Sequence, residues 1–155
     1  MPSVFRSTNL GVTEILARSL MAEHGLTDWT FKWDRSVNRL GNCNHTDRTI
    51  SLGVPYVEAN GYMDVKDTIL HEIAHALAGF KAGHGWVWKA VCKEIGAEPS
   101  RLGHHTVRLA PYKYVVVCIG CGTVLGHRHR RRKNAYHMPN GFMCGRVEYQ
   151  ERREA

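Results

Sequence analysis

The sequence predicts an α+β protein with a larger domain over residues 1–110 and a small subdomain over residues 111–155. Three observations lead to this expectation. Apolar residues recur at helical spacing in three segments of the first 100 residues, and two short segments between them read as strands. After about residue 110 the pattern changes to short strands and cysteine-bearing turns. With 155 residues, 43% of them hydrophobic, the chain can bury a core.

The first element is an amphipathic helix over residues 12–24. Thr13 is its candidate N-cap and Gly25 its stop. Its expected buried stripe comprises Ile15, Leu16, Leu20 and Met21.

Two strands are expected next. Trp29–Val37 alternates aromatic and polar residues, which is typical of a half-buried strand, and Arg48–Val54 is a second, shorter one. The segment Asn38–Asp47 between them is rich in turn-forming residues, so we expect the two strands to pair in an antiparallel manner.

A helix is expected from Val65 to Phe80, with Asp64 as its N-cap. Its expected buried face comprises Ile69, Ile73, Leu77 and Phe80. After a turn, a second helix is expected from Trp86 to Ile95, with Gly96 as its C-cap.

The longer of these helices carries the pattern HExxH. His71 and His75 lie one turn apart on the same helical face, so two imidazoles can bind one ion. Glu72 lies about 100° further round the helix, where a carboxylate can act as a general base on water. The pattern therefore indicates a catalytic zinc site with Glu72 as the catalytic residue.

The third ligand is expected to be His84. It lies between Gly83 and Gly85, which permit a tight reversal of the chain. The alternatives are Glu94, His104 and His105. Three protein ligands leave one coordination position for water, as in catalytic zinc sites.

The segment "HEIAHALAGFKAGHGWVW" resembles the SprT-like family of zinc metalloproteases, whose DNA-repair relatives include Spartan. The residues that match the family pattern are His71, Glu72, His75, His84, Gly85 and Trp88. Upstream, Leu40–Val57 resembles the family's Gly-x-Cys segment and the strand that follows it. The resemblance implies a zincin-like fold, with an antiparallel sheet packed on the HExxH helix. It also implies peptide-bond hydrolysis, often stimulated by DNA.

The C-terminal third contains half of a zinc-ribbon pattern. Cys118 and Cys121 form a CxxC knuckle, and Cys144 follows, although Val147 stands where a second knuckle would have its second cysteine. The fourth ligand could be His127, His129 or His137. We favour His137, because a turn could bring it near Cys144. The alternative is a small sheet that has lost its metal.

The two remaining cysteines and two tryptophans are expected to be structural. We assign Cys43 and Cys92 to the core, because isolated cysteines are often buried. Trp86 and Trp88 are expected to be core or helix-packing residues and not substrate contacts.

The positive charge is concentrated in the C-terminal third. Residues 1–100 hold 10 Lys and Arg against 11 Asp and Glu, whereas residues 101–155 hold 11 against 3, which gives net charges of −1 and +8. The run "HRHRRRK" predicts DNA as a partner, bound through phosphates without base readout. The expected contact residues are Arg128, Arg130, Arg131, Arg132 and Lys133.

No secretory signal and no apolar run of membrane-spanning length are visible, and the number of cysteines is odd. We therefore expect a soluble cytoplasmic protein, associated with DNA, without membrane contact and without a disulfide framework.

Three functions fit these features. The first is a zinc protease that cleaves proteins near or cross-linked to DNA. The second is a DNA-associated regulator whose HExxH metal is structural and whose Glu72 is idle. The third is a protease of bacterial or phage origin that cuts a repressor. The position of Glu72 favours an enzyme, because a structural site has no use for a carboxylate beside its ligand.

Overall fold

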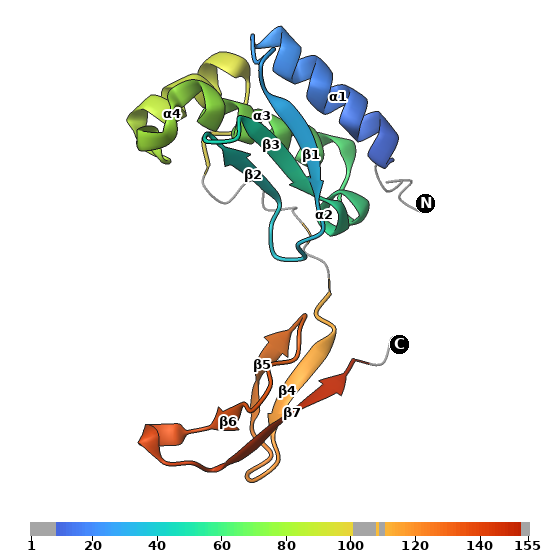
Figure 1. Ribbon diagram of the computed structural model, residues 1–155, viewed down its shortest axis with the longest axis vertical. Helices are drawn as coiled ribbons and strands as arrows, with labels where there is room; N and C mark the ends of the chain where they lie inside the picture. The colour runs from blue at the N-terminus through green and yellow to red at the C-terminus, as the bar shows by residue number, and fades with distance from the viewer. Residues whose placement is uncertain (1–8, 101–107, 109–110, 153–155) are drawn as a thin grey trace, which may run out of the picture. The chain divides into compact units, whose positions relative to one another are not determined.

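The computed structural model describes residues 9–100, 108 and 111–152, and the chain divides into two compact units, Met1–Ala110 and Pro111–Ala155 (Figure 1). The first unit combines helices with a three-stranded sheet, and the second contains a four-stranded sheet. The expected α+β class is thus confirmed.

The elements of the first unit follow one another as helix, three strands and further helices. They are α1 (Leu10–Glu23), β1 (Thr30–Asp34), β2 (Gly41–Asn44), β3 (Thr49–Gly53), α2 (Val54–Ala59), α3 (Tyr62–Ala78), the 3-10 turn η1 (Phe80–Ala82) and α4 (Trp86–Ile95).

Helix α1 begins earlier than its apolar pattern predicts. Asn9, not Thr13, is the N-cap, and its side-chain oxygen accepts hydrogen bonds from the backbone N–H groups of Gly11 and Val12. The buried stripe comprises Thr13, Ala17, Leu20 and Met21. Ile15 is 71% exposed, because a stripe through these positions leaves it on the opposite face.

The sheet of the first unit has the order β1-β3-β2 and is mixed. β1 pairs with β3 in parallel, so the expected antiparallel pairing of these two strands was wrong. The reason is β2, a strand inside the segment that was expected to be only a turn. β2 forms an antiparallel hairpin with β3, and β1 therefore lies on the other side of β3, in the same direction as it.

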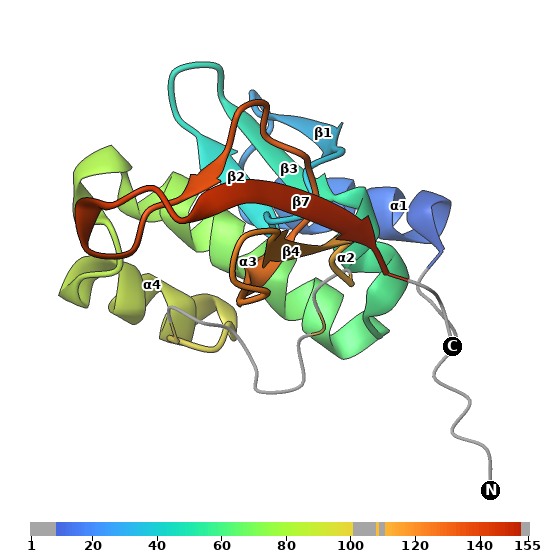
Figure 2. The same ribbon diagram turned by 90° about the horizontal axis from the view of Figure 1, so that it is seen from below.

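Helix α3 connects the sheet with the other helices. It contacts β2 and β3 of the sheet as well as α1 and α4, and Figure 2 shows α4 alongside it. Its N-cap is Gly61, so Asp64 belongs to the first turn and not to the cap. The central residues Ile69 and Ile73 are fully buried.

The predicted buried face of α3 is wrong at the C-terminal end of the helix. Leu77 is exposed and Phe80 is 82% exposed. The helix ends at Ala78, before Gly79 with its φ of 88°, so Phe80 lies beyond the helix in η1 and not on its inner face.

Helix α4 has the predicted bounds, and Gly96 caps it in the left-handed conformation with a φ of 77°. Trp88 is fully buried, as predicted, but Trp86 is 82% exposed. Residues two positions apart in an α-helix point in directions that differ by about 200°, so only one of the two indoles can face the core.

The second unit is an antiparallel sheet in the order β5-β4-β7-β6. Its elements are β4 (Tyr114–Cys118), β5 (Val124–Arg128), β6 (Tyr136–His137), the 3-10 turn η2 (Pro139–Gly141) and β7 (Gly145–Glu151). β4 alternates buried and partly exposed residues, with Tyr114, Val116 and Cys118 buried. Within the described part of the chain, no helix is long and apolar enough to cross a membrane.

Two candidate metal centres

His71, His75 and His84 form the first centre, called here the histidine centre. α3 supplies the first two residues, and the turn between η1 and α4 supplies His84. The Nε2 atom of His84 lies 3.1 Å from that of His75 and 3.2 Å from that of His71. Nitrogen ligands of a tetrahedral zinc ion, each about 2.0–2.1 Å from it, lie about 3.3 Å apart. The three side chains therefore fit a zinc ion.

The protonation state of the histidines also suits metal binding. Burial and, to a smaller extent, the charge of the neighbouring histidines lower the pKa of His71 and of His75 to about 4. These two imidazoles are consequently neutral at pH 7, with a lone pair available for a metal.

Trp88 supports all three rings of the histidine centre. Its ring centroid lies 4.7 Å from those of His71 and His84 and 5.2 Å from that of His75, on which it stacks at 23°. Its Nε1 atom has no hydrogen-bond partner among the described residues, so the contact with the ligands is one of packing. The sequence predicted that Trp88 packs in the core or on a helix, but not that it contacts the ligands.

Glu72 lies next to the ligands on α3 and is only 8% exposed. Burial raises the pKa of its carboxyl group to about 8. A carboxyl group with a pKa in this range can both accept and release a proton near neutral pH, as a general base and acid must.

The histidine centre opens into a cleft of about 420 Å³ between α3 and β2. One side is formed by Asn38–Cys43 and His45, the other by Asp67, Thr68, His71, Glu72, His75, Phe80 and His84. The contribution of β2 was not found from the sequence, because its residues are polar and typical of turns. The signal that could have revealed it is Gly41, since a glycine in a strand often marks a close approach.

Cys43 borders this cleft and is half-buried, so its assignment to the core was wrong. Burial raises the pKa of its thiol to about 12, and the negative charge of Glu72 contributes. Its sulfur lies 3.7 Å from Nε2 of His45. Cys92, in contrast, is fully buried, as expected.

The alternatives for the third ligand do not join the histidine centre within the described residues. Glu94 is exposed on α4 and is not part of the group. His104 and His105 lie outside the residues that the structure describes.

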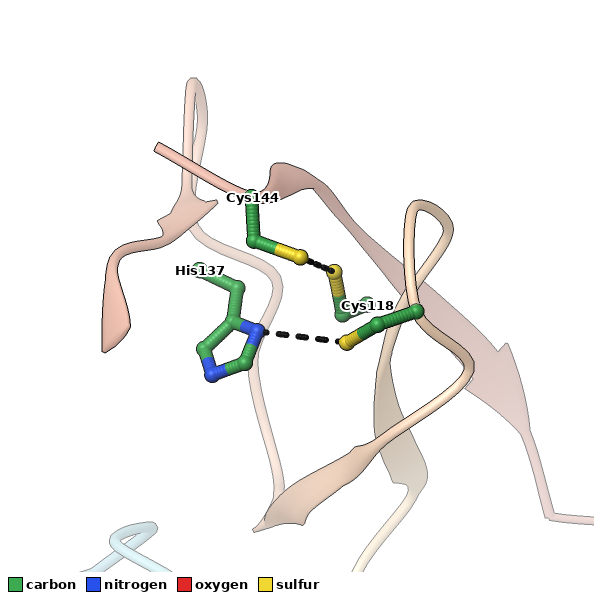
Figure 3. Close-up of side chains that lie close together, drawn as sticks. Cys118, His137 and Cys144 are labelled. Carbon is green, nitrogen blue, oxygen red and sulfur yellow. Dashed lines mark hydrogen bonds between the residues drawn. The ribbon is translucent and has the colours of Figure 1, made fainter. Parts of the chain in front are cut away.

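Cys118, Cys121, His137 and Cys144 form the second centre, the cysteine centre, with all four ligand atoms within 4.8 Å of one another. The sulfurs of Cys118 and Cys144 lie 3.9 Å apart, with His137 beside them (Figure 3). Cys121 Sγ lies 3.5 Å from Nδ1 of His137. Tetrahedral zinc ligands would lie about 3.8 Å apart for two sulfurs and about 3.6 Å for sulfur and nitrogen. The set fits zinc, and of the three candidate histidines it includes His137.

Two thiols of the cysteine centre have pKa values shifted in opposite directions. A hydrogen bond with the Thr123 hydroxyl, aided by the Thr123 backbone, lowers the pKa of Cys121 to about 6. The neighbouring Cys121 and Cys118 raise the pKa of Cys144 to about 11. One thiolate thus forms readily while its negative charge opposes the next, and a divalent cation would relieve this repulsion.

The basic run of the second unit is exposed on β5 and the turn after it. The exposed members are Arg128, Arg130, Arg131, Arg132 and Lys133. Arg131 differs from the others, because it lies 3.5 Å from a carboxylate oxygen of Glu151 and 4.9 Å from the ring centre of Tyr114.

Comparison with known proteins identifies a relationship for most of the first unit. The model of the SprT-like family matches residues 13–108, which include β2, the cleft and the histidine centre. Curated proteins gave no match to the chain.

Proposed function

The chain belongs to the SprT-like family, which is generally metalloprotease-like, and from this premise we propose that it is a zinc-dependent protease acting on DNA-associated proteins. The observation that carries the proposal is the combination of three convergent imidazoles with a buried glutamate beside them. A structural zinc site usually has four protein ligands, whereas three ligands and an adjacent base are the catalytic arrangement.

In this proposal, His71, His75 and His84 hold the metal. Zinc bound there would supply Lewis-acid activation of water and of the scissile carbonyl. Glu72 accepts a proton from the attacking water as the new C–O bond forms. It then returns the proton to the leaving amine as the C–N bond breaks, which requires a group that titrates near the working pH. The raised pKa of Glu72 supports this double role.

The substrate in this proposal is an extended segment of protein. β2 is an edge strand of its sheet and also borders the cleft that contains the histidine centre. An extended peptide can add to such an edge through backbone hydrogen bonds, which place a peptide bond near the centre without requiring a particular sequence.

DNA is proposed to bind the second unit through the exposed basic run. Arg and Lys side chains that contact phosphates bind DNA of any sequence, and they would keep the protease close to proteins on the same DNA. The exposure of all five basic side chains supports this part of the proposal.

The test compares the wild type with Glu72→Gln. We expect the variant to retain the metal of the wild type, measured by elemental analysis, and to lose cleavage of a DNA-bound protein. Glu94→Gln is the matched control, because Glu94 is an exposed glutamate on α4, and it should cleave at the wild-type rate. Cleavage with and without single-stranded DNA tests the DNA part. If Glu72→Gln cleaves as fast as the wild type, the histidine centre with Glu72 is not the proposed protease active site.

A further inference from the structure

Gly41 is the first residue of β2, and its backbone conformation does not require a glycine. It is not among the described glycines with positive φ, and it pairs with Leu52 in the regular antiparallel register. A glycine in a strand lowers stability relative to a residue with a side chain, and it often marks a place where another group approaches the backbone. The reason for glycine here is therefore that a neighbouring group leaves no room for a side chain.

The carboxyl group of Glu72 occupies that space. A Cβ atom on residue 41 would lie 2.8 Å from Oε1, 2.9 Å from Cγ and 3.1 Å from Cδ of Glu72. Carbon atoms in ordinary contact lie about 3.5–4.0 Å apart. Every side chain other than hydrogen at position 41 would thus overlap with the end of the Glu72 side chain.

Glu72 can relieve such an overlap only by moving the end of its side chain, which borders the cleft. Its backbone is part of the long helix α3, and its side chain is 8% exposed. The carboxyl group lies between the backbone of β2 on one side and the ligand-bearing helix on the other, so a methyl group at position 41 would displace it.

We infer that Gly41 is a positioning residue for the general base: its missing side chain sets where the Glu72 carboxyl group lies relative to the histidine centre. The inference rests on the proposed function only for its catalytic consequence. The contact itself is a property of the fold and can be tested without any cleavage assay.

The catalytic consequence is tested with Gly41→Ala. A displacement of about 1 Å in a reacting group can cost on the order of 100-fold in rate. We expect kcat to fall by about this factor, with KM and the metal content near the wild-type values. Asp47→Ala is the control in the turn between β2 and β3. It removes the hydrogen bond that the Asp47 carboxylate accepts from the side-chain amide of Asn44, but Asp47 neither belongs to β2 nor lines the cleft, so the variant should lower the melting temperature and leave kcat unchanged.

The contact is tested by a double-mutant cycle in the melting temperature, with Gly41→Ala made in the wild type and in Glu72→Ala. We expect Gly41→Ala to lower the melting temperature when Glu72 is present. In the Glu72→Ala background, where space has been created, it should leave the temperature unchanged or raise it. If Gly41→Ala alone does not fold but the double variant does, the inference is supported.

The outcomes separate the inference from the proposed function. Equal shifts in both backgrounds, or an unchanged kcat in Gly41→Ala, would overturn the positioning role and leave the protease intact. A wild type without any proteolytic activity would overturn the proposed function, while the cycle would still decide whether Gly41 makes room for Glu72.

Discussion

Replacing Trp88 with alanine is expected to weaken metal binding at the histidine centre as well as to destabilise the first unit. The side chain is fully buried and contacts the rings of all three histidines. Burial of a tryptophan side chain removes about 250 Å² of its surface from water. At 25 cal/mol per Å² this corresponds to about 6 kcal/mol of hydrophobic stabilisation. Because alanine keeps part of this burial and the neighbours relax, we expect a loss of about 3–5 kcal/mol in the free energy of unfolding.

The effect on the metal follows from the same contacts. Without the indole, the three imidazoles lose the surface against which they are held, and more of their rotational freedom must be lost when the metal binds. Residues that orient metal ligands typically contribute about 10–100-fold in affinity. We therefore expect the dissociation constant for zinc to rise by about this factor in Trp88→Ala. Trp88→Phe should give much smaller effects, because it keeps an aromatic ring and the Nε1 atom of Trp88 has no hydrogen bond to any described residue that could be lost.

The assay is urea unfolding of chelator-treated protein, together with zinc competition against a coloured chelator. Trp86→Ala is the control, because this tryptophan lies two residues away but is 82% exposed, and it should change neither quantity by more than about 0.5 kcal/mol. If Trp88→Ala binds zinc as tightly as Trp86→Ala, the indole does not organise the ligands.

Three further results are expected. Cys144→Ser should reduce the zinc content from two ions per chain to one, measured by elemental analysis; an unchanged content would show that the cysteine centre does not hold metal. In chelator-treated protein, Glu72→Gln should become more stable than the wild type as the pH rises from 5 to 7, by about 3 kcal/mol in urea unfolding. The sign follows because burial raises the folded-state pKa of Glu72 from 4.5 to about 8, so the wild type loses stability over this range through Glu72 and the variant does not. A difference in unfolding free energy that stays constant with pH would contradict this prediction. Arg130→Ala should reduce the slope of log affinity for DNA against log salt by about 0.7–0.9. Arg131→Ala should change the slope less, because Glu151 already lies beside that guanidinium group, and equal slopes would speak against this difference.

Much of the histidine centre could be predicted from the sequence because it depends on local geometry. Residues four apart on a helix share a face whatever surrounds them, so the spacing of His71 and His75 was sufficient to place them together. The glycines beside His84 indicated a reversal that could return it to the helix. The CxxC pattern likewise brings Cys118 and Cys121 together within one turn.

Other parts of the site depended on which distant segments meet. The parallel pairing of β1 with β3 arose because β2, hidden in a polar segment, took the opposite edge of β3. The sequence did not decide which of three histidines is the fourth ligand of the cysteine centre. The pairing of β6 with β7 in the sheet of the second unit brings His137 to it.

The sequence by itself therefore determined the class of the fold, the helix that carries HExxH and the identity of the three clustered histidines. Only the tertiary structure decided that Trp88 and not Trp86 supports them, and that Gly41 makes room for Glu72. The physical reason is the range of the interactions. Helical spacing and turn propensities act between neighbours in the chain, whereas contacts across the core are settled by how whole elements pack, which no short stretch of residues specifies.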